Sequence, residues 1–176
     1  MQPTLRTARL TLTACSAKDV EQLRALWNEP QVREFIFDDE PVSLQRTQEL
    51  VKGMLDLAPR GLGLWLMRET NGETLAGCVA LLQPDSLAAI EPQLPAGSEL
   101  MIALHPNSWN RGMATEACRE LIGYAFDDLR LERLIAGVDT PNIASAKLIT
   151  ALGFQPFSHR QGPKYPLQIY TLDNTK

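Results

Sequence analysis

Residues 99–138 constrain the fold more than any other part of the chain. An acid, Glu99, precedes the apolar run 100–104, a pattern typical of a strand covered on both faces. A helix over about residues 112–126 follows, because apolar side chains recur there at helical spacing: Ala114, Ala117, Cys118, Leu121, Ile122 and Ala125. A second apolar run covers residues 134–138. Strand, helix and strand at this spacing predict a βαβ unit with parallel strands and a right-handed crossover.

Further elements are predicted before this unit. Alternation over residues 9–13 indicates a strand. Ser16, with Asp19 three positions on, is a candidate cap for a helix that ends at Pro30, and Ser43 for a helix that ends near Pro59. Two apolar runs, 62–67 and 75–82, flank the turn Thr70-Asn71-Gly72-Glu73 and predict an antiparallel hairpin.

After that hairpin, the prolines and glycine of residues 84–97 predict a loop with at most one helical turn. Beyond the βαβ unit, Asn142 is a candidate cap for a last helix that stops at Gly153. Residues 154–157 and 165–172 are predicted to be closing strands. The expected architecture is therefore an α/β fold with a mixed central sheet, in which the fourth and fifth predicted strands are parallel.

Composition limits the classes of protein that fit. The 176 residues predict one domain, residues 1–176, and 44% hydrophobic content is enough for a core. A net charge of −4 argues against a nucleic-acid partner, and the N-terminus lacks the apolar stretch of a signal peptide or membrane span. We therefore expect a cytoplasmic protein, monomeric or homodimeric. Three widely spaced cysteines and two histidines favour neither a disulfide framework nor a metal site.

The start of the helix near Gly112 has the features of a phosphate site. A helix N-terminus presents unpaired N–H groups and a partial positive charge, which favour phosphate. Gly112 lets an oxygen approach the backbone, Ala114 leaves the first turn uncrowded, and Arg111 adds a cation. An ordinary glycine-containing helix start is the alternative interpretation.

The segment Trp109-Asn110-Arg111-Gly112-Met113-Ala114 resembles the [Q/R/W]-x-x-G-x-[G/A] motif of the GNAT family of N-acetyltransferases. Its continuation, Thr115-Glu116-Ala117, is similar to the branch that contains ribosomal-protein N-terminal acetyltransferases. Other segments match that branch in the same order along the chain: Arg9-Leu10-Thr11-Leu12, Ser98-Glu99-Leu100, Tyr124-Ala125-Phe126, and Asn142-Ile143-Ala144-Ser145 before Leu152-Gly153-Phe154.

This resemblance implies transfer of an acetyl group from acetyl-CoA to a primary amine, either a protein N-terminus or a small amine, by direct attack in a ternary complex. It also implies that the fourth and fifth predicted strands splay apart. The pantetheine arm of acetyl-CoA would then pair with the backbone near Ile102 and Leu104, and Asn142 would bond that arm or serve only as a helix cap. The pyrophosphate would lie on backbone N–H groups of five consecutive residues: Arg111, Gly112, Met113, Ala114 and Thr115.

Two side chains are candidates for the chemistry. Glu99 matches a glutamate of the branch, and partial burial would raise its pKa enough for it to accept a proton from the amine, directly or through water. Its alternative interpretation is a solvated acid at a strand end. Ser145 matches a serine near the thiol and would protonate the leaving sulfur, or is simply the polar third residue of the helix.

The chain departs from the branch at several positions, and the tyrosine that often follows the last helix's serine is also missing, with Leu148 and Ile149 in its neighbourhood. Asn110 replaces a glycine, and asparagine tolerates the unusual backbone angles expected there. Met101 and Ile102 replace a glycine and an aromatic residue, which gives the acceptor channel a bulkier wall. The alternative function is accordingly a non-catalytic acyl-CoA-binding or regulatory module with a degenerate acceptor site.

Overall fold

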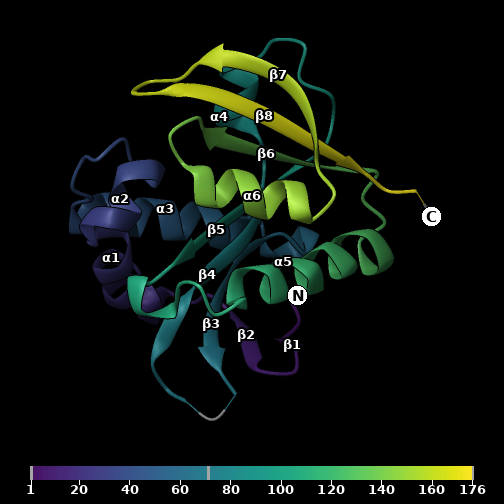
Figure 1. Ribbon diagram of the computed structural model, residues 1–176. Coiled ribbons are helices and arrows are strands. Elements are labelled where there is room, and N and C mark those ends of the chain that lie inside the picture. The colour runs from purple at the N-terminus through teal and green to yellow at the C-terminus, as the bar shows by residue number, and fades with distance from the viewer. Residues whose placement is uncertain (1, 71, 176) are drawn as a thin grey trace.

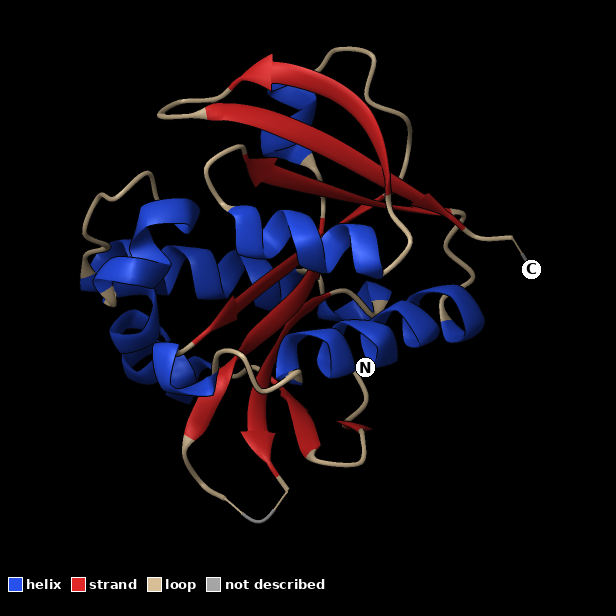
Figure 2. Cartoon of the chain, in the orientation of Figure 1, coloured by secondary structure: helices blue, strands red, loops and turns tan. Residues whose placement is uncertain are grey.

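The computed structural model describes residues 2–70 and 72–175, which form one eight-stranded sheet in the order β1-β2-β3-β4-β5-β6-β8-β7 (Figures 1 and 2). Within these residues the strands are β1 Leu5–Arg6, β2 Leu10–Ala14, β3 Gly63–Glu69, β4 Leu75–Leu82, β5 Ser98–Leu104, β6 Arg133–Asp139, β7 Gln155–Gln161 and β8 Pro166–Asp173. Neighbouring strands are antiparallel except β5 and β6, which are parallel. The predicted mixed α/β sheet is confirmed.

The helices are α1 Val20–Asn28, α2 Pro30–Ile36, α3 Leu44–Asp56, α4 Asp85–Ile90, α5 Met113–Gly123 and α6 Ile143–Ala151, and a π-helical turn, Tyr124–Asp128, extends α5. Short 3-10 turns lie at Ala17–Asp19, Ala58–Arg60 and Pro106–Ser108. The predicted caps are confirmed. Ser16 and Asp19 form a capping box before α1, and the Ser43 side chain accepts a hydrogen bond from the Arg46 amide at the start of α3.

Helices cover both faces of the sheet (Figure 1). The core on one face contains Leu121 of α5 and Ile149 of α6, packed against strand residues such as Leu12 and Val79. The opposite face holds α1, α2 and α3, whose buried apolar side chains meet β3 and β4. A smaller cluster joins Leu87 of α4 to β6 and β8. Because β5 is apolar on both faces, it lies at the centre of this sandwich, as its apolar run predicts.

Several elements differ from the prediction, including the six-residue helix α4 inside the predicted loop 84–97 and the strand β7, which is longer than the predicted strand 154–157. The two-residue strand β1 was not expected, so the fourth and fifth predicted strands are β5 and β6 here. Pro30 ends α1 as predicted but also begins α2, because proline fits the first helical position, where no N–H partner is needed. The predicted hairpin turn includes Asn71, which lies outside the described residues, whereas the antiparallel pairing of β3 with β4 is confirmed.

Candidate active site

The parallel pairing of β5 with β6 is short. It consists of Ser98 opposite Leu134 and Glu99 opposite Ile135, and within the described residues the two strands pair no further. The remainder of β5 therefore faces a gap on its β6 side, and the predicted splay is confirmed. The Leu104 carbonyl at the end of this edge accepts a hydrogen bond from the Trp109 Nε1, at 2.9 Å.

A cavity of about 650 Å³ opens at this gap. Its walls come from α2, from the end of β5, from the Trp109–Asn110 turn, and from the first turns of α5 and α6. Two of its apolar lining residues, Trp109 and Ile143, are 38% and 58% exposed. Exposed apolar side chains around a concave surface are typical of a ligand-binding site, so the cavity suits a long ligand with an apolar arm.

Most of the sequence-predicted site residues line this cavity: Ile102, Leu104, Met113, Ala114, Thr115, Asn142 and Ser145. Gly112 borders a separate surface hollow that shares Thr115 with the cavity. Arg111 and Glu99 belong to neither lining. The predicted constellation is thus brought together at the gap except for Arg111 and Glu99.

The start of α5 is left without a cap. Gly112 has φ +75° and no side chain caps the helix there, while Asn110 has φ +58°, the left-handed conformation that its residue type tolerates. The first helical bond runs from the Glu116 amide to the Gly112 carbonyl, and within the described residues the amides of 112–115 donate no hydrogen bond. Four free amides at a helix N-terminus fit the phosphates of a nucleotide-like ligand.

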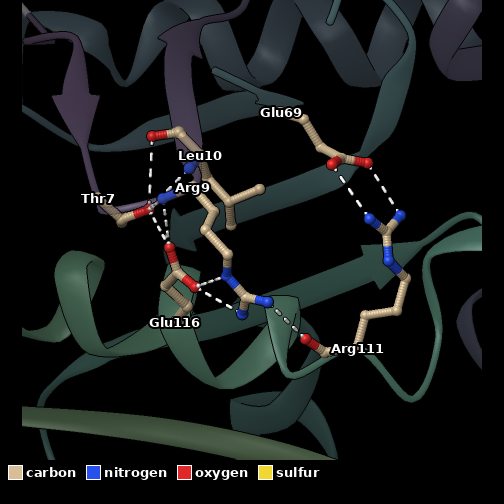
Figure 3. A network of polar contacts seen from close by, with 6 residues as sticks. All are labelled: Thr7, Arg9, Leu10, Glu69, Arg111 and Glu116. Carbon is tan, nitrogen blue, oxygen red and sulfur yellow. Dashed lines mark hydrogen bonds and ion pairs between the residues drawn. The ribbon is translucent and has the colours of Figure 1, made fainter. Parts of the chain in front are cut away.

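Arg111 is already paired. Its guanidinium donates to both carboxylate oxygens of Glu69, at 2.9 and 3.1 Å (Figure 3). Both side chains are about half exposed. The pair ties the turn before α5 to the end of β3. A direct contact of Arg111 with phosphate stays a prediction.

Asn142 serves as the predicted cap of α6. Its Oδ1 accepts a hydrogen bond from the Ser145 amide at 3.1 Å, and both residues line the cavity. The side-chain amide nitrogen of Asn142 remains a second polar group at the same place. The capping role and a contact with a ligand are therefore compatible.

Glu99 lies on the opposite face of the sheet from α5 and α6. Leu100 faces the α5 core, so its neighbour Glu99 faces the other way, beside its pairing partners Leu82 and Ile135. Burial, and secondarily the negative charge of Asp85 on α4, raises the pKa of Glu99 to about 7. A carboxyl group with that pKa can accept a proton near neutral pH, which is the property expected of a general base.

The wall that α2 contributes was not predicted from the sequence. Val32, Phe35 and Ile36 all line the cavity, and they recur at helical spacing after Pro30. Proline at the first helical position followed by this spacing was the available signal.

Fold and site together define a class of α/β protein with a splayed parallel strand pair beside a phosphate-type helix start. Residues 9–155 match the family model described as an acetyltransferase (GNAT) domain, so the chain belongs to the GNAT acetyltransferase family.

Three similar proteins illustrate that membership. The uncharacterized N-acetyltransferase p20 of Bacillus licheniformis is 29% identical over 155 residues, which are 86% of this chain and 82% of p20. A spermidine N-acetyltransferase from Vibrio cholerae, solved with CoA and spermine, has 20% identity and a TM-score of 0.75 over 95% of this chain and 96% of that one. RimL, a ribosomal L7/L12 alpha-N-protein acetyltransferase solved with CoA, has 16% identity and a TM-score of 0.77 over 97% and 98%. At these identities the two structures show a shared fold.

No helix in the described part of the chain combines the length and the hydropathy needed to span a membrane.

Proposed function

We propose that this protein is an acetyl-CoA-dependent N-acetyltransferase that moves an acetyl group to a primary amine in a ternary complex. The observation that carries the proposal is the uncapped start of α5, with its left-handed Gly112, beside the gap between β5 and β6. Free amides suit the pyrophosphate, and the apolar cavity suits the pantetheine arm. When bound, acetyl-CoA supplies the activated acyl group as a thioester.

The residues divide into two groups. Ile102 and Leu104 offer their backbone to the pantetheine arm, and Asn142 bonds the same arm. The amides of the α5 start hold the phosphates, with Arg111, Gly112, Met113, Ala114 and Thr115 as their predicted positions. These residues orient the donor along the gap.

Glu99 and Ser145 would handle the protons. The Glu99 carboxylate takes a proton from the attacking amine, directly or through water, because only a neutral amine is nucleophilic. The Ser145 hydroxyl, at the start of α6, gives a proton to the departing sulfur. Their places on opposite faces of the sheet suit an amine that approaches from the α1–α3 side while the donor lies on the α5–α6 side.

The acceptor is proposed as a class. RimL acts on a ribosomal protein, and the Vibrio cholerae relative acts on spermidine, so similar folds accept both protein N-termini and small amines. The loop after α2 contains three consecutive acids, Asp38-Asp39-Glu40. The charge of one of them is already neutralised, because Asp39 pairs with Arg33 at 3.1 Å and with Lys164 at 3.6 Å. Because these observations do not select one kind of acceptor, we propose a primary amine that belongs to a protein N-terminus or to a small molecule.

A second candidate function is a non-catalytic acyl-CoA-binding or regulatory module. It is favoured by the position of Glu99 outside the lining of the cavity and by the bulky Met101 and Ile102 beside the expected acceptor channel. Such a protein would keep the site for the phosphates and lack turnover.

The first test is the thermal unfolding midpoint with and without acetyl-CoA, with ATP and NAD as controls. A ligand at 100 times its Kd stabilises a folded protein by about 2.7 kcal/mol, which shifts Tm by roughly 5–10 °C for a chain of this size. We expect a shift with acetyl-CoA and a much smaller one with ATP or NAD. No shift at saturating acetyl-CoA would refute both candidate functions.

Turnover separates the two candidates. The protein is incubated with acetyl-CoA and a panel that includes polyamines, amino acids, aminoglycosides and short peptides with free N-termini, and release of free thiol is measured. Amine-dependent release supports the enzyme. Tight acetyl-CoA binding without thiol release across the panel would favour the binding module.

A further inference from the structure

Arg9, far from the α5 motif in sequence, is bonded to the start of α5 (Figure 3). Its Nε and Nη2 both lie 2.7 Å from Glu116 Oε2, and its Nη1 donates to the Arg111 carbonyl at 3.0 Å. Its backbone amide donates to Glu116 Oε1 at 2.9 Å. Arg9, which directly precedes β2, thus contacts both the first turn of α5 and the turn before that helix.

Glu116 is the anchor of this network. Besides the three contacts with Arg9, it accepts a hydrogen bond from the Thr7 hydroxyl, and its side chain is only 19% exposed. The Thr7 hydroxyl in turn accepts a hydrogen bond from the Leu10 amide at 2.9 Å, which closes the turn between β1 and β2. The hydrogen bond from Thr7 and the contacts with Arg9 keep the pKa of Glu116 below its usual value, so the carboxylate stays charged.

The contact with the Arg111 carbonyl fixes a peptide plane. In a trans peptide the carbonyl of one residue and the N–H of the next point in opposite directions. Because Arg9 holds the Arg111 carbonyl, it also directs the Gly112 N–H away from the guanidinium. Arg111 lies between two residues in the left-handed conformation, Asn110 and Gly112, and such a backbone needs outside support to keep one geometry.

Arg9 also packs against Gly112, whose φ of +75° favours glycine. A Cβ on Gly112 would lie 3.4 Å from Arg9 Nη2, so the guanidinium packs directly over this residue. From the other side, the Glu69 carboxylate holds the Arg111 side chain. The turn is therefore braced by Arg9 from the β1–β2 hairpin and by Glu69 from β3.

We propose that Arg9 and its anchor Glu116 are positioning residues, which preset the turn at 110–112 so that the amides at the start of α5 are ready for the phosphates of acetyl-CoA. The inference rests on the proposed function, since acetyl-CoA is the ligand that the turn would hold. Neither side chain takes part in proton transfer. Substituting them should therefore change the affinity for acetyl-CoA and not the rate of the chemical step.

Two substitutions separate positioning from simple electrostatics. Arg9→Lys keeps the charge, but a lysine cannot hold Glu116 and the Arg111 carbonyl with the planar fork of a guanidinium. Glu116→Gln removes a negative charge near the phosphates, which on electrostatic grounds alone would strengthen binding. Positioning predicts the opposite sign for Glu116→Gln, namely weaker binding.

The experiment measures the Kd of acetyl-CoA by titration calorimetry for wild type, Arg9→Lys, Glu116→Gln and a matched control, Arg6→Lys. Arg6 lies in the same hairpin, and among the residues that the structure describes its side chain reaches only the Thr11 hydroxyl, at 3.4 Å. We expect Arg9→Lys and Glu116→Gln to weaken binding about five- to tenfold, the size of effect that loss of one ordinary hydrogen bond produces. Arg6→Lys should bind like wild type, and kcat at saturating acetyl-CoA should be unchanged in all variants.

A second readout needs no ligand. Amide hydrogen exchange in the free protein should be faster at residues 116–119, whose amides form the first hydrogen bonds of α5, in Arg9→Lys and Glu116→Gln, and unchanged in Arg6→Lys. If Glu116→Gln does not fold, Arg9→Lys, which keeps an ion pair, carries the test.

The outcomes distinguish the inference from the function on which it rests. If wild type does not bind acetyl-CoA, both are overturned. If wild type binds and Arg9→Lys behaves like Arg6→Lys in affinity and exchange, the positioning role alone is overturned. Tighter binding by Glu116→Gln would also overturn it, because charge would then outweigh geometry.

Discussion

If Glu99 is the base, as proposed, activity depends on pH in a definite direction. Its pKa is raised to about 7, so the carboxylate required of a base forms only as the pH passes through that value. We expect kcat to rise between about pH 6 and pH 8, and Glu99→Gln to lower kcat at least tenfold while acetyl-CoA affinity stays near wild type. Rates measured over a pH series at saturating substrates give kcat for wild type and Glu99→Gln. Titration calorimetry gives their affinity for acetyl-CoA.

The raised pKa of Glu99 makes the stability of the folded protein fall as pH rises, whereas kcat is expected to rise. The folded state binds a proton on Glu99 up to about pH 7, whereas an unfolded glutamate releases it near its ordinary value, so stability falls as pH rises between the two. Glu99→Gln should therefore be more stable than wild type at pH 8, by about 3 kcal/mol, and equal to it near pH 4. Denaturant unfolding at the two pH values measures this.

Asp85 supplies the control for both effects. Its charge contributes to the raised pKa of Glu99, although less than burial does. Asp85→Asn should move the rise in kcat to lower pH without abolishing activity. A pH profile of Glu99→Gln identical to that of wild type would remove Glu99 from the mechanism.

Asn142 caps α6 and is proposed to bind the donor, and substitution can separate the two roles. Asn142→Ala loses the cap on α6 and should lower stability by about 1 kcal/mol, whereas Asn142→Ser keeps a capping oxygen and should leave Tm near wild type. Both variants should weaken acetyl-CoA binding if the side chain also holds the pantetheine arm. Wild-type affinity in Asn142→Ser would leave only the capping role.

Ser145→Ala, by comparison, should lower kcat without changing affinity or Tm.

The first turn of α5 offers a prediction with an internal control. Gly112 has φ +75°, where a β-branched residue is strained by roughly 1–3 kcal/mol, and its Cβ would press on Arg9. Gly112→Val should weaken acetyl-CoA binding about tenfold or more, measured by titration calorimetry. Gly123 lies at the other end of the same helix, where an added Cβ would meet no neighbouring side chain or strand within 4 Å, so Gly123→Ala should bind normally. Wild-type affinity in folded Gly112→Val would refute the phosphate site.

Elements with long, regular periodicity were predictable from the sequence, and short ones were not. The stripe of α5 and the apolar run of β5 specify their own structure, because burial on a fixed face or on both faces leaves a strong pattern. β1 has two residues, too few for any pattern. α2 was hidden because Pro30 is equally suited to stopping one helix and to starting the next.

For the whole molecule, the sequence allowed prediction of which segments lie along the gap between β5 and β6. It did not allow prediction of the side-chain contacts between segments that are distant in sequence. The βαβ unit brings the β5 edge, the α5 start and the α6 start to one place, which local sequence encodes. The pairing of Glu69 with Arg111 and of Arg9 with Glu116 depends on how β2, β3 and α5 pack, which no spacing rule gives. The face on which Glu99 lies also depends on the register of β5 between β4 and β6.

The two residue pairs between β5 and β6 have a kinetic consequence. α5 packs on the strands of the β1–β5 part, and α6 packs on β6, so each part of the sheet has its own covering helix. A donor laid along the gap would contact both parts where the sheet itself does not pair them, and it would leave only as fast as the walls of the gap move apart. The residence time of the donor, and of the spent CoA that replaces it, would then depend on the relative motion of α5 and α6 and not on proton transfer at Glu99.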